Sequence, residues 1–126
     1  MEAKVQVTLN SDQIHKLEEA SRKAFEMTVE AVLSDIKASA AVPKDTGTLE
    51  DSGFTNIDVE SLVGKVIFDT PYARRLYWNP EYNFRTDKNA AAGGMWMAPY
   101  VDGAKRNFIT DTFMRLFKEQ SGGLIR

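Results

Sequence analysis

Side chains suited to metal binding or nucleophilic chemistry are scarce in this sequence. The chain has one histidine, His15, and no cysteine. One imidazole without thiolates cannot form the usual zinc sites, which combine several His and Cys ligands. His15 lies between Ile14 and Lys16 at the start of a helical pattern, where a surface imidazole is the simplest interpretation. We therefore expect neither a metal site nor catalysis at His15.

The 18 acidic residues are spread along the chain rather than paired. Glu50 and Asp51 are neighbours, but adjacent residues of a helix point in different directions. No phosphate loop, dinucleotide fingerprint, nucleophile elbow or zincin motif occurs. We predict no catalytic residue, no cofactor and no enzymatic activity. A small enzyme that used scattered carboxylates would instead require a concave pocket holding at least two of them.

A stretch of alternating basic and aromatic residues is the strongest candidate for a contact with a partner. Its members are Arg74, Arg75, Trp78, Tyr82, Phe84 and Arg85. Three interpretations remain open: packing of the neighbouring apolar residues into the core, a protein interface rich in Trp, Tyr and Arg, or a stacking platform for single-stranded nucleic acid. The net charge of -2 makes nucleic acid the least favoured of the three.

The length of 126 residues fits a single domain that spans residues 1–126. No apolar run approaches the roughly 18 residues of a membrane span, so we expect no membrane partner. The first residues lack the basic and apolar regions of a signal peptide. These features predict a soluble protein that is made in a cytoplasm.

A strand and a long helix are predicted at the N-terminal end. Residues 4–9 alternate apolar and polar side chains, which is typical of a half-buried strand. From Ser11 to about Ser39 apolar residues recur at helical spacing, with Asn10 as N-cap and Gln13 completing a capping box. At about 1.5 Å per residue this helix exceeds the size of a compact domain, so one end should overhang and lean on a partner. Pro43 should end it.

The rest of the chain predicts a hairpin, a short helix, a loop and a last helix. Residues 54–60 and 62–70 read as antiparallel strands, and Pro71 opens a helix over residues 72–77. Residues 81–94 have no period and predict a long mobile loop. A closing helix should begin at Pro99, with Val101 on its apolar stripe, and end at Gly122-Gly123. The fold class is α+β: a small antiparallel sheet, formed by the N-terminal strand and the hairpin, packed by a long N-terminal and a C-terminal helix.

The segment of residues 42–52 has a local logic of its own. Asp45 and Thr46 can hydrogen-bond to nearby backbone amides, and Gly47 permits a positive φ. Thr48–Asp51 can then form one helical turn that places Leu49 under the end of the long helix. This segment is a sound helix-to-strand connection and carries no reactive group.

The same segment also carries a resemblance. Its pattern is Pro-x-Asp-Thr-Gly-x-Leu-x-x-Ser, at Pro43, Asp45, Thr46, Gly47, Leu49 and Ser52, followed after the hairpin by Pro71, Tyr72 and Ala73. Further matching positions are Asn83-Phe84, Asp87-Lys88-Asn89, Trp96 and Ala104-Lys105. In this order they resemble the small minor capsid or head–tail connector proteins of siphophages, over most of residues 10–120. Many relatives continue Tyr-Ala with an acidic residue and a Gly-Thr turn, whereas this chain continues with Arg74-Arg75.

This resemblance implies a structural protein of the virion, made in the cytoplasm of a bacterial host. Its station would be the head–tail junction, as a minor capsid, neck or tail-completion protein. Such a protein acts by self-assembly into a homo-oligomeric ring and by docking to neighbouring head–tail or tail proteins. We expect the contacts on the long helix, the basic–aromatic stretch and the loop of residues 81–94. The alternative is a nucleic-acid-binding module that uses residues 74–85.

Overall fold

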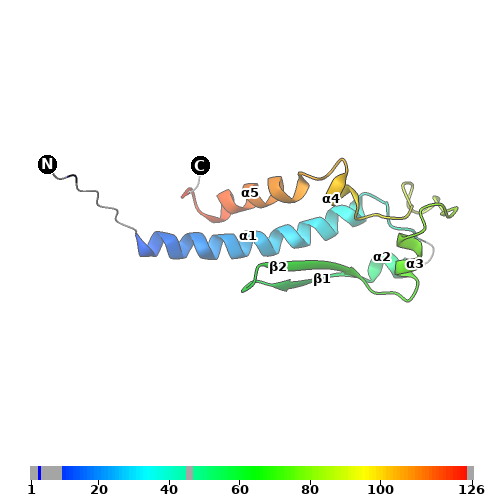
Figure 1. Cartoon of the computed structure of the whole chain (residues 1–126), viewed down its shortest axis with the longest axis horizontal. Helices are drawn as coiled ribbons and strands as arrows, with labels where there is room; N and C mark the ends of the chain where they lie inside the picture. The colour runs from blue at the N-terminus through cyan, green and yellow to red at the C-terminus, as the bar shows by residue number, and fades with distance from the viewer. Residues whose placement is uncertain (1–2, 4–9, 45–46, 125–126) are drawn as a thin grey trace.

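The structure is a computed structural model that describes residue 3, residues 10–44 and residues 47–124. Its elements in chain order are α1 (Ser11–Ala38), α2 (Thr48–Asp51), β1 (Gly53–Asp58), β2 (Val63–Phe68), α3 (Ala73–Tyr77), α4 (Pro99–Asp102) and α5 (Phe108–Gln120). The hairpin β1–β2 runs along one side of α1 and α5 along the other (Figure 1). The fold is therefore α+β, as the sequence predicts. The strand predicted at residues 4–9 lies outside the described residues.

Helix α1 begins at the predicted cap and ends earlier than Pro43. The side chain of Asn10 accepts a hydrogen bond of 3.1 Å from the backbone N–H of Gln13. At the other end Ser39 caps the helix, and Ala40 adopts a left-handed conformation with φ 56°. The left-handed residue stops the helical hydrogen bonds before the chain reaches Pro43. The predicted extent is thus confirmed, but its predicted cause is wrong.

The N-terminal turns of α1 project beyond both α5 and the hairpin (Figure 1). Buried residues of α1 begin only at Ala20, and Ile14 is exposed although it lies on the predicted apolar stripe. This overhang is the one that the helix length predicts. Most residues at the start of α1 are therefore exposed, and Gln13, Lys16 and Glu19 lie near the residues that follow α5.

The hairpin pairs β1 with β2 in an antiparallel register that places Thr55 opposite Val66. Half-buried and exposed residues alternate along β1, as expected for a strand with one covered face. In the turn the Asp58 carboxylate accepts hydrogen bonds from the backbone N–H groups of Glu60 and Ser61. The predicted pair of strands is confirmed.

The predicted single closing helix is wrong, because the chain leaves the helical path at Gly103. That residue is extended, and a Cβ there would lie 2.6 Å from the Cα of Pro99. The break separates α4 from α5 and leaves Val101 82 % exposed, so Val101 is not part of an apolar stripe. The predicted end is confirmed, since Gly122 and Gly123 follow α5 with positive φ angles.

The core lies at the C-terminal end of α1, where the hairpin, α3 and α4 meet it. Its buried members are Val32, Ile36, Val42, Leu49, Ala73, Trp96 and Tyr100. Trp96 is 3 % exposed and meets the rings of Phe68 and Tyr77 edge to face, at centroid distances of 5.7 Å and 4.9 Å. Trp96 is therefore a core residue. Among the described residues, no helix combines the length and apolar character that crossing a membrane requires.

Candidate interaction surface

The segment of residues 42–52 forms the joint between α1 and the hairpin. Gly47 has φ 91°, as predicted, and Leu49 of α2 is 2 % exposed and packs in the core with Ile36. The hydroxyl of Ser52 donates to the Leu49 carbonyl and accepts a hydrogen bond of 3.1 Å from the N–H of Asp69, just after β2. Pro43, near the start of this joint, is half-buried. Asp45 and Thr46 lie outside the described residues.

Asn89 ties the loop of residues 81–94 to this joint. Its buried side chain donates a hydrogen bond of 2.8 Å to the Val42 carbonyl and one of 3.3 Å to the Glu50 carboxylate. The same carboxylate forms an ion pair of 3.0 Å with Lys44, and this contact raises the pKa of Lys44 above its usual value. The loop has no helix or strand, as predicted, but Asn89 fixes its centre against α2. In the sequence Asn89 is only one of the matching positions, and no local pattern indicates this contact.

The second matching segment, Pro71–Ala73, has one residue in the interior and two on the surface. Ala73 opens α3 and is buried in the same core as Leu49 and Trp96. Pro71 and Tyr72, by contrast, are exposed just before α3. Five of the described matching positions are therefore buried in the framework, and the others are half-buried or exposed. The buried five are Gly47, Leu49, Ala73, Asn89 and Trp96.

The basic–aromatic stretch lies on the surface beside this framework. Arg74, Arg75, Trp78, Tyr82 and Arg85 are exposed and Phe84 is half-buried; we call these six residues the arginine–aromatic surface. Trp78 is 63 % exposed, although its ring meets that of Tyr77 edge to face at 4.9 Å. The packing interpretation holds for Leu76 and Tyr77, which pack against the core, and not for Tyr72.

A groove of about 430 Å³ opens next to this surface. It is lined by Pro43, Lys44, Gly47, Thr48, Leu49, Tyr72, Leu76, Tyr82, Asn83, Phe84 and Arg85. The described lining contains two cations and no carboxylate, so this groove is not the acidic pocket that an enzyme with paired carboxylates would require. Both cations already have anionic partners, because Lys44 pairs with Glu50 and Arg85 pairs with Asp87 at 2.5 Å.

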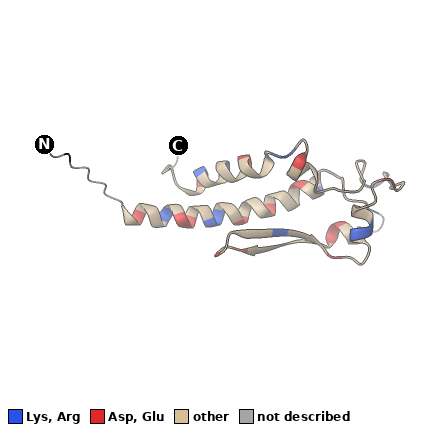
Figure 2. Cartoon of the chain, in the orientation of Figure 1, with Lys and Arg blue, Asp and Glu red and all other residues tan. Residues whose placement is uncertain are grey.

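Charge is unevenly distributed over the elements around this groove. Figure 2 shows acidic and basic residues interspersed along α1, whereas α2 is acidic and α3 is basic. The acids of α2 are Glu50 and Asp51, and the basic residues of α3 are Arg74 and Arg75. The arginine–aromatic surface therefore combines aromatic rings with two arginines of α3 that form no ion pair within the described part of the chain, a combination that is common in protein interfaces.

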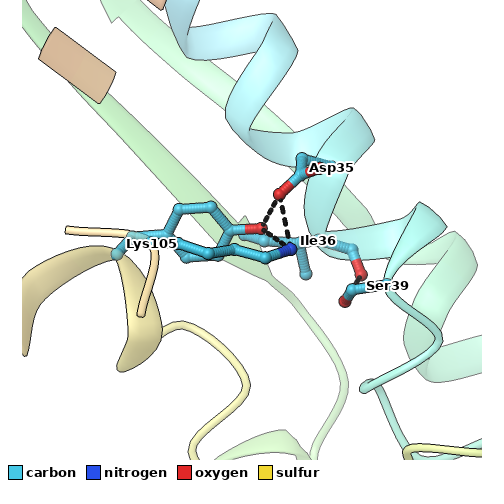
Figure 3. A network of polar contacts seen from close by, with 5 residues as sticks. Asp35, Ile36, Ser39 and Lys105 are labelled. Carbon is cyan, nitrogen blue, oxygen red and sulfur yellow. Dashed lines mark hydrogen bonds and ion pairs between the residues drawn. The ribbon is translucent and has the colours of Figure 1, made fainter. Parts of the chain in front are cut away.

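A polar network holds the segment between α4 and α5 against α1. In Figure 3 the carboxylate of Asp35 and the amine of Lys105 point toward each other, and they form an ion pair of 2.8 Å. The hydroxyl of Tyr100 also donates to Asp35. Burial by itself raises the pKa of Asp35, but the hydrogen bonds from Lys105 and Tyr100 and the charge of Lys105 outweigh it and hold this pKa below its ordinary value. Burial and the Asp35 carboxylate together raise the pKa of Tyr100.

His15 is exposed on α1 and its Nε2 lies 3.1 Å from the Glu19 carboxylate, one helical turn away. In the described part of the chain, no group of three His, Cys, Asp or Glu residues is placed to hold a metal ion. No family model matches the chain, and no curated protein or solved structure matches it either. The resemblance to siphophage proteins accordingly depends on the matching positions alone.

Proposed function

We propose that this protein is a structural component of a tailed-phage or prophage particle at the head–tail junction, as a minor capsid, neck or tail-completion protein. It acts by assembling into a ring of identical subunits and by docking to neighbouring particle proteins. The observation that carries this proposal is the arginine–aromatic surface, held on a framework whose buried residues include five of the siphophage-like positions.

The buried matching residues support the part of this proposal that concerns the fold. Gly47, Leu49, Ala73 and Trp96 come from three separate segments, and the last three pack in one core. Residues that meet in a core depend on one another, so their occurrence together in the expected order is more informative than any one of them. They support the proposal that the chain folds like such proteins.

The exposed side chains of the arginine–aromatic surface support the part of the proposal that concerns docking to neighbouring particle proteins. Trp78 leaves 63 % of its surface in solvent. A tryptophan beside Arg74 and Arg75 is a combination strongly enriched among the residues that dominate binding energy in protein interfaces. Burial of an indole ring removes on the order of 150–250 Å² of surface from water, enough to anchor a subunit contact. Docking onto a neighbouring ring of subunits would bury the indole side chain of Trp78.

Two observations on particles test the proposal. Cells that carry the gene should release tailed particles in which mass spectrometry detects the chain at a constant ratio to the major capsid protein. Deletion of the gene should yield heads and tails that negative-stain microscopy shows unjoined, and expression in trans should restore joining. Particles that lack the chain and join normally after deletion would refute the proposal.

A matched pair of substitutions tests the surface. Trp78→Ser should leave the melting temperature nearly unchanged, because most of the side chain is in solvent, yet fail to restore joined particles. Val101→Ser is the control, since Val101 is also exposed and apolar, on α4, which Figure 1 places on the other side of α1 from α3. If both variants restore joining equally, the surface is not a contact site.

The second candidate function is binding of single-stranded nucleic acid, favoured by Arg74 and Arg75 next to the exposed ring of Trp78. Titration of labelled single-stranded DNA at low and moderate salt measures it. Affinity should fall steeply with salt and depend on all three residues if this function holds. No binding at low salt removes the alternative.

A further inference from the structure

A narrow apolar groove of about 220 Å³ runs between β2, α1 and α5. Its lining is Phe25, Thr28, Val29 and Val32 of α1, Gly64 and Val66 of β2, and Ile109 and Phe113 of α5. Apolar side chains dominate this lining, and Ile109 remains 42 % exposed. Exposed apolar surface of this kind is typical of a site that binds apolar side chains of a partner.

The groove runs along a free edge of the sheet. In the described part of the chain, the sheet has two strands and β2 pairs with β1 alone. The described lining includes residues of β2 and α5 but none of β1, so the groove lies on the side of β2 away from β1. A strand edge with unpaired N–H and C=O groups accepts a further strand, and the apolar groove beside it accepts alternate side chains of that strand.

The sequence contains a segment with the required pattern. In residues 4–9, Val5, Val7 and Leu9 alternate with polar residues. A strand with this pattern, added to β2, directs its apolar side chains to one face and its polar side chains to the other. The apolar face would cover the α1 residues that the hairpin leaves open, and the polar face would meet solvent.

The segment cannot reach the groove of its own chain. It ends one residue before Asn10, the N-cap of α1. Phe25 lies fifteen residues after Asn10 along α1, which is roughly 22 Å away at 1.5 Å per residue. Val5 precedes Asn10 by five residues, which span at most about 18 Å when fully extended. The apolar residues of the segment are therefore too close to Asn10 along the chain to reach the groove, and the start of α1 itself lies beyond the hairpin (Figure 1).

We propose that residues 4–9 of one copy add as a third strand to β2 of a second copy and place Val5, Val7 and Leu9 in its groove. Each copy then offers a segment at one end and a groove at the other, which makes the contact head-to-tail. A head-to-tail contact closes into a ring when the rotation between copies allows it. That use of the contact rests on the proposed function, whereas the contact itself can be measured on the purified chain.

Disulfide trapping locates the contact, because the chain has no cysteine of its own. Full-length Val7→Cys and Ile109→Cys variants, mixed and oxidised, should give a mixed dimer with one disulfide. Thr8→Cys mixed with Ile109→Cys is the control for the strand face, and Val7→Cys mixed with Met114→Cys is the control for the groove, since Met114 is a similarly exposed residue of α5 outside the lining. Both control mixtures should cross-link several-fold less.

Sedimentation velocity over a range of concentrations measures the strength of the contact. Val7→Asp and Ile109→Glu should each weaken self-association by roughly tenfold or more, because each places a charge in the apolar groove. Thr8→Asp and Met114→Glu are the matched controls and should associate like the parent chain. All four positions lie outside the buried core or outside the described residues, and circular dichroism checks that each variant is folded.

Three outcomes overturn this inference. They are a monomeric parent chain at all concentrations, association that Val7→Asp leaves unchanged, and an internal disulfide in a monomeric Val7→Cys/Ile109→Cys double variant. None of them bears on whether the chain is found in particles. If the chain joins heads to tails but does not exchange this segment, the inference is refuted and the proposed function stands. If the chain exchanges the segment but is absent from particles, the inference stands and the proposed function is refuted.

Discussion

Replacement of Asn89 with alanine should destabilise the protein by about 2–3 kcal/mol, although Asn89 lies in a loop without secondary structure. The side chain donates to the Val42 carbonyl at 2.8 Å and to the Glu50 carboxylate at 3.3 Å. Loss of the first bond leaves a carbonyl unpaired next to a fully buried side chain, which costs about 1–3 kcal/mol. The second bond is long and Glu50 keeps its ion pair with Lys44, so it adds less.

Urea denaturation measures this loss, and thermal melting should show a decrease of about 10 °C, because 1 kcal/mol corresponds to roughly 4 °C for a domain of this size. Hydrogen exchange should accelerate at the amide of Gly93, which donates to the Ala41 carbonyl and depends on the same anchoring of the loop. Asn83→Ala is the control, since Asn83 is an exposed residue of the same loop. If the two alanine variants differ by less than about 0.5 kcal/mol, Asn89 does not anchor the loop.

Asn89→Asp sharpens the test by keeping the shape and changing the charge. The new carboxylate would face Glu50 and cannot donate while ionised, so this variant should be less stable than Asn89→Ala at neutral pH. Repulsion from Glu50 raises the pKa of the new carboxyl in the folded state above its unfolded value. The deficit should therefore shrink as the pH falls through that raised pKa. A deficit that is independent of pH would contradict the contact with Glu50.

Three further changes test the framework. Leu49→Ala should cost about 2–5 kcal/mol in urea denaturation because it empties a buried site, whereas Leu62→Ala in the exposed hairpin turn should cost less than about 0.5 kcal/mol; equal costs would contradict the burial of Leu49. Gly47→Ala should cost about 1–2 kcal/mol because Gly47 has a positive φ, and a neutral effect would show that the joint has another conformation. The pKa of Asp35 is lowered in the folded state, so its contribution to stability is full above roughly pH 4 and is lost as the pH falls through the folded-state pKa. Asp35→Asn should therefore reduce the dependence of the unfolding free energy on pH in this acid range. An unchanged dependence would show that the network contributes nothing.

The sequence predicts α1 and the hairpin well because the features that form them involve residues close together in the chain. The Asn10 cap and the long helical period need only neighbouring residues, and so does the alternation along β1. The break at Gly103 was missed because an isolated glycine does not by itself end a helical pattern. The break is favoured by contacts with a residue far away in the sequence. Tyr100 and Lys105 both bind Asp35, and the path that the chain takes after α4 allows both contacts.

The candidate surface was predictable in its residue types but not in its exposure. A Trp–Tyr–Arg stretch is equally compatible with a core segment, and only the arrangement of α3 and the loop decides that Trp78 faces solvent while Tyr77 packs on Trp96. The role of Asn89 was beyond sequence reasoning for a similar reason. Its partner Val42 lies 47 residues away, and an asparagine in an irregular loop is ordinarily assigned to a local turn.

The separation between buried joints and exposed surface determines which variants can test a function. Leu49 and Trp96 lie in one core, so a substitution at either position lowers the stability of the fold and would reduce assembly through that loss alone. Such a result would be the same for a capsid protein, a nucleic-acid-binding module or an enzyme. Trp78→Ser and Val7→Asp are different, because neither removes a buried contact of the described core. A loss of assembly in these two variants at an unchanged melting temperature can come only from a lost contact, and that makes them the decisive pair for the proposed function and for strand exchange.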